Sequence, residues 1–312
     1  MTSNKKKHVE DAENMQDSGE DVSGDDESDE EIKILPGEEV NRKLHHLSKL
    51  LIIPKSILKE IQVDFEGRNP IDSDFDGIQQ LLRQLFLKAH INLTEFANTI
   101  VSQNYIGSVI KQCWDEEMTD DDEEDDPNVV FGVTTVINLT SRKESQFVKD
   151  IKSIIIERAE KSSTDATLKL LRDILTNDER TTGLLINERY INIPPQISVP
   201  LFESLCREIK RANEKNMPYN FSYYVMILKF HRKEAAKGKQ SEDFFSNPEE
   251  ELFAREALAS FECSVQSECD SGLSGKWRES DEELTPYRKV IVIDGKKLPE
   301  IVESINGFIH GS

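Results

Sequence analysis

The sequence lacks the features that mark several protein classes. No apolar run reaches the roughly 20 residues that span a bilayer, and the N-terminus, MTSNKKKHVEDAE, lacks the apolar core of a signal peptide. The cysteines form no CxxC pair, which argues against a metal site or a disulfide framework; they are Cys113, Cys206, Cys263 and Cys269. We therefore expect a protein of a reducing compartment, without a membrane span or a bound metal.

Recognisable catalytic motifs are also missing. A loop that binds the phosphates of a cofactor needs closely spaced glycines before a helix, but residues 103–108 hold a single glycine. The segment SGLSGKW fails as a phosphate loop as well, because Asp270 stands where its first glycine belongs and Trp277 replaces the Ser or Thr. The six histidines are scattered, and no nucleophile elbow accompanies them. The sequence therefore predicts a protein with no enzymatic activity and no cofactor.

Negative charge is concentrated in two runs. The net charge is −21 over 312 residues. Residues 1–39 hold 14 acids and 4 bases, and residues 115–126 hold 10 acids and no base, which leaves 36 acids and 35 bases in the remainder. Such runs bury too little apolar surface to offset the entropy of ordering. We therefore predict a disordered acidic tail over residues 1–62, and an acidic loop at 115–127 within a near-neutral domain over residues 63–312.

The acidic loop differs in its expected role from the tail. A tail of this kind serves solubility in many proteins, whereas a loop between structured segments holds its charge at a fixed surface. Attraction of a basic partner to that surface fades beyond a Debye length of about 10 Å at 0.1 M salt. The same charge argues against direct binding of nucleic acid by that face. The predicted protein-binding residues of the loop are Asp120, Asp121, Asp122, Glu123, Glu124, Asp125 and Asp126.

The N-terminal part holds two further features. Ser18, Ser23 and Ser28 each precede an acid by three residues, which makes them candidates for phosphorylation by acid-directed kinases. Residues 41–59 reverse the sign of the charge, with five Lys or Arg and no acid around an apolar cluster at 50–53. Such a basic amphipathic segment suits a membrane surface or a protein partner.

Apolar residues at helical spacing predict a series of helices. Ser73 and Asp76 resemble a capping box at the start of the first one. A further helix is predicted in the first half of residues 249–265 from its composition. The predicted apolar faces are Ile78, Leu81, Leu82, Leu85 and Phe86; Leu93, Phe96 and Ile100; Phe147, Ile151, Ile154 and Ile155; Leu168, Leu171 and Leu175; Ile197, Leu201, Leu205 and Ile209; and Leu298, Ile301, Val302 and Ile305.

Stretches rich in β-branched and aromatic residues predict strands between these helices. The predicted strands are residues 109–110, 129–139, 184–186, 221–230, the second half of 249–265, and 290–293. The two helices between 129–139 and 184–186 are long enough for a crossover, so we expect these two strands to be parallel. Strands and helices interleave without internal repeats. The sequence therefore predicts a single α/β domain with a mixed central sheet covered by helices.

The stretch GLLINERYINIPPQISVPL, residues 183–201, lies at the centre of this arrangement. It predicts a buried strand, a turn that carries Glu188 and Arg189, a second apolar segment from Tyr190, and a helix after a Pro-Pro corner. Because charged residues interrupt apolar segments, these three residues are candidates for a partner-binding face; the alternative is a plain surface turn with a core tyrosine. Trp277, on a glycine-flanked loop, is either an interface anchor or a packing residue.

Six segments together resemble the BCCIP family, eukaryotic nuclear proteins named for interacting with a recombination tumour suppressor and a cyclin-kinase inhibitor. They are DFDGIQQLLRQLF, QNYIGSVIKQ, VVFGVTTVINL, GLLINERYINIPPQISVP, LSGKW and LTPYRKVIVI. The resemblance runs from Val63 to the C-terminus and includes the acidic loop. It implies a fold similar to the GCN5-related acetyltransferases, without demonstrated acetyl transfer and with no catalytic residue to carry over. Residues 41–59 have no counterpart in the family pattern, so we interpret them as a lineage-specific insert or a translated intron.

The resemblance also implies a function. Family members are chaperones of a basic large-subunit ribosomal protein in ribosome biogenesis and nuclear export, and partners in DNA repair and cell-cycle control. We therefore expect a non-enzymatic chaperone or adaptor in the nucleus that shuttles to the cytoplasm. Its expected partners are that ribosomal protein and, in addition, recombination and cyclin-kinase-inhibitor proteins. Two alternatives stay open: a degenerate GCN5-like acetyltransferase, and a DNA-repair scaffold whose acidic runs serve only solubility.

Overall fold

The computed structural model describes residues 64–113, 129–233, 241–269 and 284–311. All of them lie in one compact unit, Gln62–Ser312. The predictions for the tail, the basic segment 41–59, the acidic loop and Trp277 concern residues outside these ranges. No helix in the described ranges combines the length and the apolar character needed to cross a membrane.

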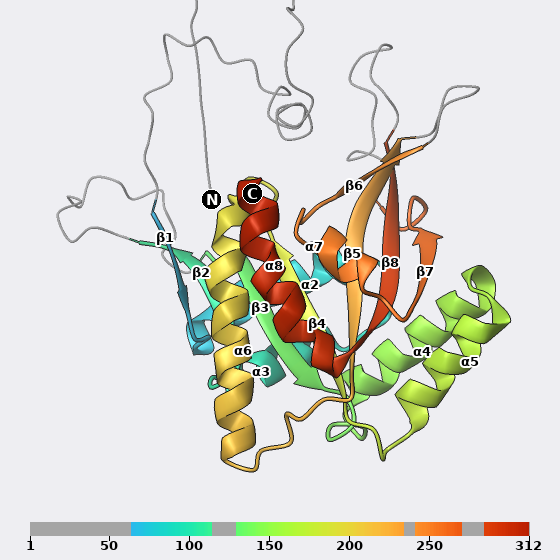
Figure 1. Cartoon of the computed structure of the whole chain (residues 1–312), viewed down its shortest axis with the longest axis horizontal. Helices are drawn as coiled ribbons and strands as arrows, with labels where there is room; N and C mark the ends of the chain where they lie inside the picture. Colours follow the sequence, from blue (N-terminus) through green and yellow to red (C-terminus); the bar gives the residue numbers. More distant parts are fainter. Residues whose placement is uncertain (1–63, 114–128, 234–240, 270–283, 312) are drawn as a thin grey trace, which may run out of the picture. The chain divides into compact units, whose positions relative to one another are not determined.

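Eight strands of the described residues form a mixed sheet (Figure 1). Their order is β1-β2-β3-β4-β5-β8-β7, and β6 pairs with β5. β4 and β5 are parallel, and the other neighbouring pairs are antiparallel. The predicted α/β domain with a mixed sheet is confirmed, whereas its likeness to the GCN5-related fold stays a prediction. The strands are β1 Phe65–Arg68, β2 Ser108–Gln112, β3 Gly132–Asn138, β4 Thr182–Arg189, β5 Tyr223–Lys233, β6 Glu242–Phe245, β7 Ala259–Ser264 and β8 Leu284–Asp294.

Helices cover both faces of this sheet. One apolar core is formed by α2 (Phe75–Phe86), α3 (Leu93–Ser102), α4 (Gln146–Ser162) and α5 (Asp165–Thr176). The opposite core is formed by α6 (Ser198–Glu214), α7 (Glu250–Arg255) and α8 (Leu298–His310), and Figure 1 shows α6 and α8 side by side there. Leu184 packs in the first core and Leu185 in the second. Alternate residues of the interior strands therefore serve both cores, which makes these strands apolar on both faces.

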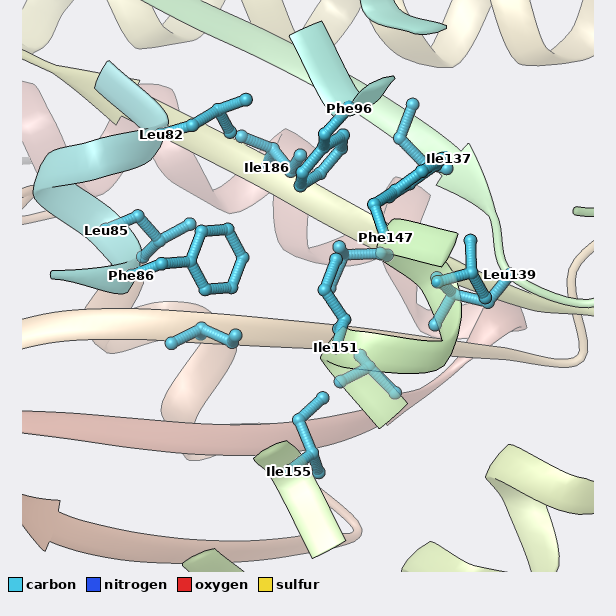
Figure 2. Close-up of a cluster of buried hydrophobic side chains, with 14 of the residues drawn as sticks. Leu82, Leu85, Phe86, Phe96, Ile137, Leu139, Phe147, Ile151, Ile155 and Ile186 are labelled. Atoms are coloured by element: carbon cyan, nitrogen blue, oxygen red, sulfur yellow. The ribbon is translucent and has the colours of Figure 1, made fainter. Parts of the chain in front are cut away.

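Two stacked phenylalanine rings lie at the centre of the first core. Phe96 and Phe147 are fully buried, with ring centroids 4.7 Å apart and planes at 16°. Phe86 adds a tilted ring 6.1 Å from Phe96. Figure 2 shows these side chains together with Leu85 and Ile151. The rings come from α2, α3 and α4, so the stack joins three helices over the sheet.

The predicted parallel pairing of residues 129–139 with 184–186 is wrong. β3 and β4 are antiparallel, from Gly132 opposite Arg189 to Asn138 opposite Gly183. The reason is the number of helices between them. A single helix carries the chain to the far end of a sheet, whereas α4 runs out and α5 runs back, so the chain re-enters at the end where β3 stopped. The parallel crossover is instead β4–α6–β5, which contains one long helix.

The predicted capping box of Ser73 and Asp76 is also wrong. The start of α2 is organised by Asp74, which is fully buried. Its carboxylate accepts hydrogen bonds from Arg68 at 2.7 and 2.9 Å and from the Ile71 N–H at 2.9 Å. Burial alone raises the pKa of Asp74, but these partners outweigh it and hold the pKa below its ordinary value. Asp74 thus ties β1 to the beginning of α2.

Candidate functional site

The parallel pair β4–β5 is the first place to look for a ligand site. In open α/β sheets, ligands bind at the carboxyl ends of parallel strands, where the strand order reverses. The two strands pair as far as Leu185 opposite Met226, and then continue to Arg189 and Lys233 without pairing to each other. They therefore diverge and leave a wedge between them.

The segment from β6 to the start of α7 fills this wedge. β8 pairs with one edge of β5 along its whole length, so β6 pairs with the other edge, beyond the point where β4 diverges. The Ser246 N–H donates to the Lys229 carbonyl oxygen at 2.8 Å. Asn247 Nδ2 donates to the Asn187 carbonyl oxygen, also at 2.8 Å. The inserted segment thus bridges both diverging strands.

Buried polar side chains meet at this insertion, and we call them the wedge cluster. Arg189 forms a two-pronged ion pair with Glu249, in which Nη2 lies 2.8 Å from Oε2. Asn187 Nδ2 donates to Glu249 Oε1 at 2.8 Å and to Glu250 Oε1 at 3.2 Å. Lys229 forms a second ion pair, with Glu188. The cluster consists of Asn187, Glu188, Arg189, Lys229, Asn247, Glu249 and Glu250, all buried.

Glu250 has a buried carboxylate oxygen without a hydrogen-bond partner. Its Oε1 accepts from Asn247 at 2.8 Å, while Oε2 has no hydrogen-bond partner. Burial, and then the nearby charges of Glu249 and Glu188, raise the pKa of Glu250 well above its ordinary value. The neutral acid of this side chain is therefore favoured more than in an exposed glutamate, because a second buried charge beside Glu249 is costly.

We expect Glu250→Gln to stabilise the protein increasingly as the pH rises. A pKa raised by folding contributes stability that is complete below the unfolded pKa, about 4.3, and is lost as the pH rises towards the folded pKa. The glutamine keeps the shape and does not titrate, so its advantage over the wild type grows over the pH range above the unfolded pKa of about 4.3. Urea unfolding across this range measures it, with Glu251→Gln, a half-exposed neighbour, as control. A stability difference that does not change with pH would contradict this account.

The polar side chains of the wedge cluster are buried and bonded mainly to one another. The cluster contains no Ser, Cys or His, and the described residues hold no group of three metal-ligating side chains. His231 lies further along β5, and burial lowers its pKa. The ion pairs instead fix β6 and α7 against β4. We therefore interpret the cluster as a structural element that occupies the position of a ligand site.

The structure corrects the predicted position of Glu188 and Arg189. Both residues lie in β4 rather than in a turn, with exposed fractions of 2% and 5%. Each is paired with a buried residue of opposite charge, so neither is available to a partner. Tyr190 follows the strand and is half-buried, and its role in binding stays a prediction. The other predicted site residues, Asp120–Asp126, Trp277 and the three serines, lie outside the described residues.

Residue 107 shows why the QNYIGS segment does not act as a phosphate loop. Gly107 has a φ of 96°, a conformation that favours glycine, and a Cβ there would lie 2.4 Å from the side chain of Thr135. Its N–H donates to Glu208 Oε2 at 2.7 Å. A carboxylate therefore occupies the position that a phosphate oxygen would take, and the glycine serves the tight turn into β2.

The sequence analysis missed an aromatic row at one end of the sheet. The rings of Phe65 and Phe131 lie 5.3 Å apart, and those of Phe131 and Tyr190 lie 6.4 Å apart, both edge to face. The row crosses the start of β1, the start of β3 and the residue after β4. Each of these aromatics stands next to a strand end in the sequence, but the alignment of the three ends depends on the register of the sheet.

The chain is similar in sequence to several known proteins. The family model of BCCIP matches residues 60–253, a range that begins directly after the basic segment 41–59. "Protein BCCIP homolog" of Drosophila melanogaster is 48% identical over 257 residues, covering 81% of this chain and 86% of that protein. "BRCA2 and CDKN1A-interacting protein" of Homo sapiens is 35% identical over 260 residues, covering 80% and 82%.

Fungal proteins are similar as well. "Protein bcp1" of Aspergillus fumigatus is 30% identical over 273 residues, covering 81% of this chain and 89% of that protein. Among solved structures, "Crystal structure of BCP1 from Saccharomyces Cerevisiae" matches with a TM-score of 0.49 and 18% identity, covering 82% of this chain and 95% of that one. The family model and the sequence identities agree, and the chain belongs to the BCCIP family.

Proposed function

We propose that this protein is a non-enzymatic nuclear binding protein, a chaperone or adaptor for a basic large-subunit ribosomal protein in ribosome biogenesis and nuclear export. In this role it shuttles between nucleus and cytoplasm. Membership of the BCCIP family supports a binding function, because the relatives' names describe interactions rather than reactions. Phosphorylation of Ser18, Ser23 and Ser28 would add to the negative charge of the tail.

The observation that carries this proposal is the placement of charge. The chain between the end of β2 and the start of β3 contains the ten acids of residues 115–126. Both attachment points are fixed by backbone hydrogen bonds: the Cys113 N–H donates to Asp64 at 2.8 Å, and the Phe131 N–H donates to Ile110 at 2.9 Å. The run of negative charge thus begins and ends in the chain at described strands, and in the proposed role it attracts and masks a cationic surface.

Co-expression tests the proposal. Each basic large-subunit ribosomal protein is produced in turn with this chain, and soluble complex is scored. Residues 120–126 are intact or have Asp and Glu changed to Asn and Gln. We expect the client to be soluble with the intact loop and several-fold less soluble with the neutral one. The matched control neutralises the seven acids of residues 21–31, and should leave solubility nearly unchanged. Absence of any soluble client with the wild type would refute the chaperone function.

A degenerate GCN5-like acetyltransferase is the first alternative. Two features argue against it. Protein side chains fill the wedge between β4 and β5. The Gly107 N–H already donates to the Glu208 carboxylate, whereas a cofactor phosphate needs free N–H groups. Titration calorimetry with acetyl-CoA tests it directly. Saturable binding would favour the enzyme, and heats equal to dilution are the expected result.

A DNA-repair scaffold is the second alternative. The names of the bovine, mouse and human relatives support it, because they state interaction with BRCA2 and CDKN1A. In that case recombination and cyclin-kinase-inhibitor proteins are the main partners, and the acidic runs serve only solubility. A pull-down with the variant in which the acids of residues 120–126 are neutralised distinguishes the two functions. A scaffold keeps its partners after neutralisation, whereas a chaperone loses its basic client.

A further inference from the structure

A small pocket lies between the last turns of α6 and the turn that leads into β2. Its volume is about 260 Å³, just below the range of pockets that hold drug-sized ligands. None of its lining residues belongs to the wedge cluster. We call it the α6 pocket, and its lining includes Asn69, Tyr105, Glu208, Arg211, Lys215 and Met217.

Contacts between separate elements hold the walls of the α6 pocket. The Gly107 N–H donates to Glu208 Oε2 at 2.7 Å, which joins the turn before β2 to α6. Asn69, directly after β1, donates from Nδ2 to the Gly107 carbonyl oxygen at 3.1 Å. The ring of Tyr105 lies edge to face on the buried Tyr219, with centroids 6.0 Å apart. The pocket is therefore built from three parts of the chain that the fold brings together.

The charge in the α6 pocket is positive. Arg211 and Lys215 are four residues apart and share one face of the helix. Within the ranges that the structure describes, neither side chain forms an ion pair or a hydrogen bond. Glu208 is an acid in the lining, but both of its oxygens are engaged, one by the Gly107 N–H and one by the Ser204 hydroxyl at 3.1 Å. Two unpaired cations thus face the pocket in a chain whose net charge is −21.

Neutral donors stand beside these cations. Asn69 Nδ2 gives one hydrogen to the Gly107 carbonyl oxygen and has a second one. The Tyr105 hydroxyl lies 3.2 Å from the Tyr219 hydroxyl, and either can be the donor. When Tyr219 donates, the Tyr105 hydrogen is available to a ligand. The helix dipole favours cations near the end of α6, but it does not account for further donors around a hollow.

We propose that the α6 pocket binds the phosphate monoester of a small molecule. A phosphate monoester carries about two negative charges at neutral pH and has three terminal oxygens, which match two cations and two neutral donors. Arg211 can pair with two of the oxygens through its planar guanidinium, and Lys215 acts as a point charge. Met217 provides an apolar wall for the organic part of the ester. This site goes beyond the proposed function and does not depend on it.

Phosphorus-31 NMR of phenyl phosphate with the full chain tests the proposal. We expect the wild type to broaden the resonance of the probe, and Arg211→Met or Lys215→Met to weaken binding about fivefold. The matched control is Lys210→Met, which removes an exposed cation of the same helix that does not line the pocket, and it should bind as the wild type does. Tyr105→Phe, which removes only the hydroxyl, should weaken binding about threefold.

The pH dependence identifies the phosphate. Its second proton leaves near pH 6, so binding should strengthen as the pH rises through that value. Benzoate carries a single negative charge over this range, and it should compete weakly and without the same pH dependence. Inorganic phosphate as a competitor separates a free phosphate from an ester, and we expect it to bind less tightly than phenyl phosphate because it makes no contact with Met217.

Four outcomes would contradict this proposal. A wild type that leaves the probe resonance unchanged has no such site. Equal binding by the wild type and the double variant Arg211→Met with Lys215→Met would place the ligand elsewhere on the chain. Benzoate that competes as well as phenyl phosphate would show that the pocket recognises a single negative charge. Inorganic phosphate that binds as tightly as phenyl phosphate would overturn the ester as the ligand.

Discussion

Glu249→Ala should destabilise the protein by about 3–5 kcal/mol, because it leaves Arg189 buried without a counter-charge. Arg189 is 5% exposed, and both prongs of its guanidinium bond to Glu249. The same carboxylate accepts from Asn187 at 2.8 Å. For a domain of this size such a loss lowers the melting temperature by roughly 10 °C. Denaturant unfolding monitored by circular dichroism measures it.

Two variants control this prediction. Glu251→Ala, two residues along α7, removes a half-exposed carboxylate that pairs with Arg255 at 2.7 Å, and should change stability by less than about 0.5 kcal/mol. The double variant Arg189→Met with Glu249→Leu removes both charges, and should recover most of the loss. Equal losses for Glu249→Ala and Glu251→Ala would contradict the structural role of the wedge cluster.

Phe147→Ala should cost about 3–5 kcal/mol, the range for removing a fully buried phenylalanine. The substitution deletes one ring of the stack with Phe96 and leaves a cavity where α2, α3 and α4 meet. The surrounding side chains come from three helices and the sheet, so we expect little collapse into the space. The melting temperature and the hydrogen exchange of α3 and α4 measure the effect.

Phe308→Ala is the matched control for the core. Phe308 lies half-buried on α8, with its ring 5.8 Å from the Arg255 guanidinium. We expect its truncation to cost about 1 kcal/mol, because much of the ring is exposed in the folded protein. A Phe147→Ala protein as stable as Phe308→Ala would mean that the stacked rings do not organise the first core.

Local patterns in the sequence predicted most of the elements but not their pairing. The predicted strands 129–139 and 221–230 overlap β3 and β5, and the predicted helical faces from Ile78 to Ile305 lie on helices, because burial imposes a period that the sequence displays. β1 and β6 were missed because each has four residues and includes charged ones. The prediction that β4 runs parallel to β3 was wrong, because two helices, α4 and α5, lie between the strands and return the chain to the end of the sheet where β3 stopped.

The same limit applies to the site. The sequence predicts exposed positions for Glu188 and Arg189, because charged residues are rarely buried without partners. Their partners, Lys229 and Glu249, lie 41 and 60 residues further along the chain, so no local pattern reveals them. The aromatic row of Phe65, Phe131 and Tyr190 likewise depends on strand register. By contrast, the acidic run is a property of composition, and the sequence alone shows it.

The affinity for the captured ribosomal protein, measured against salt, tests the central claim most directly. The chain with residues 120–126 intact should bind more tightly than the neutral variant at about 50 mM salt, and the difference should vanish near 0.5 M. This result would show that the acidic run draws the basic client to the sheet end. Equal affinities for the two proteins at low salt would contradict the account, and would leave the acidic run with a role in solubility alone.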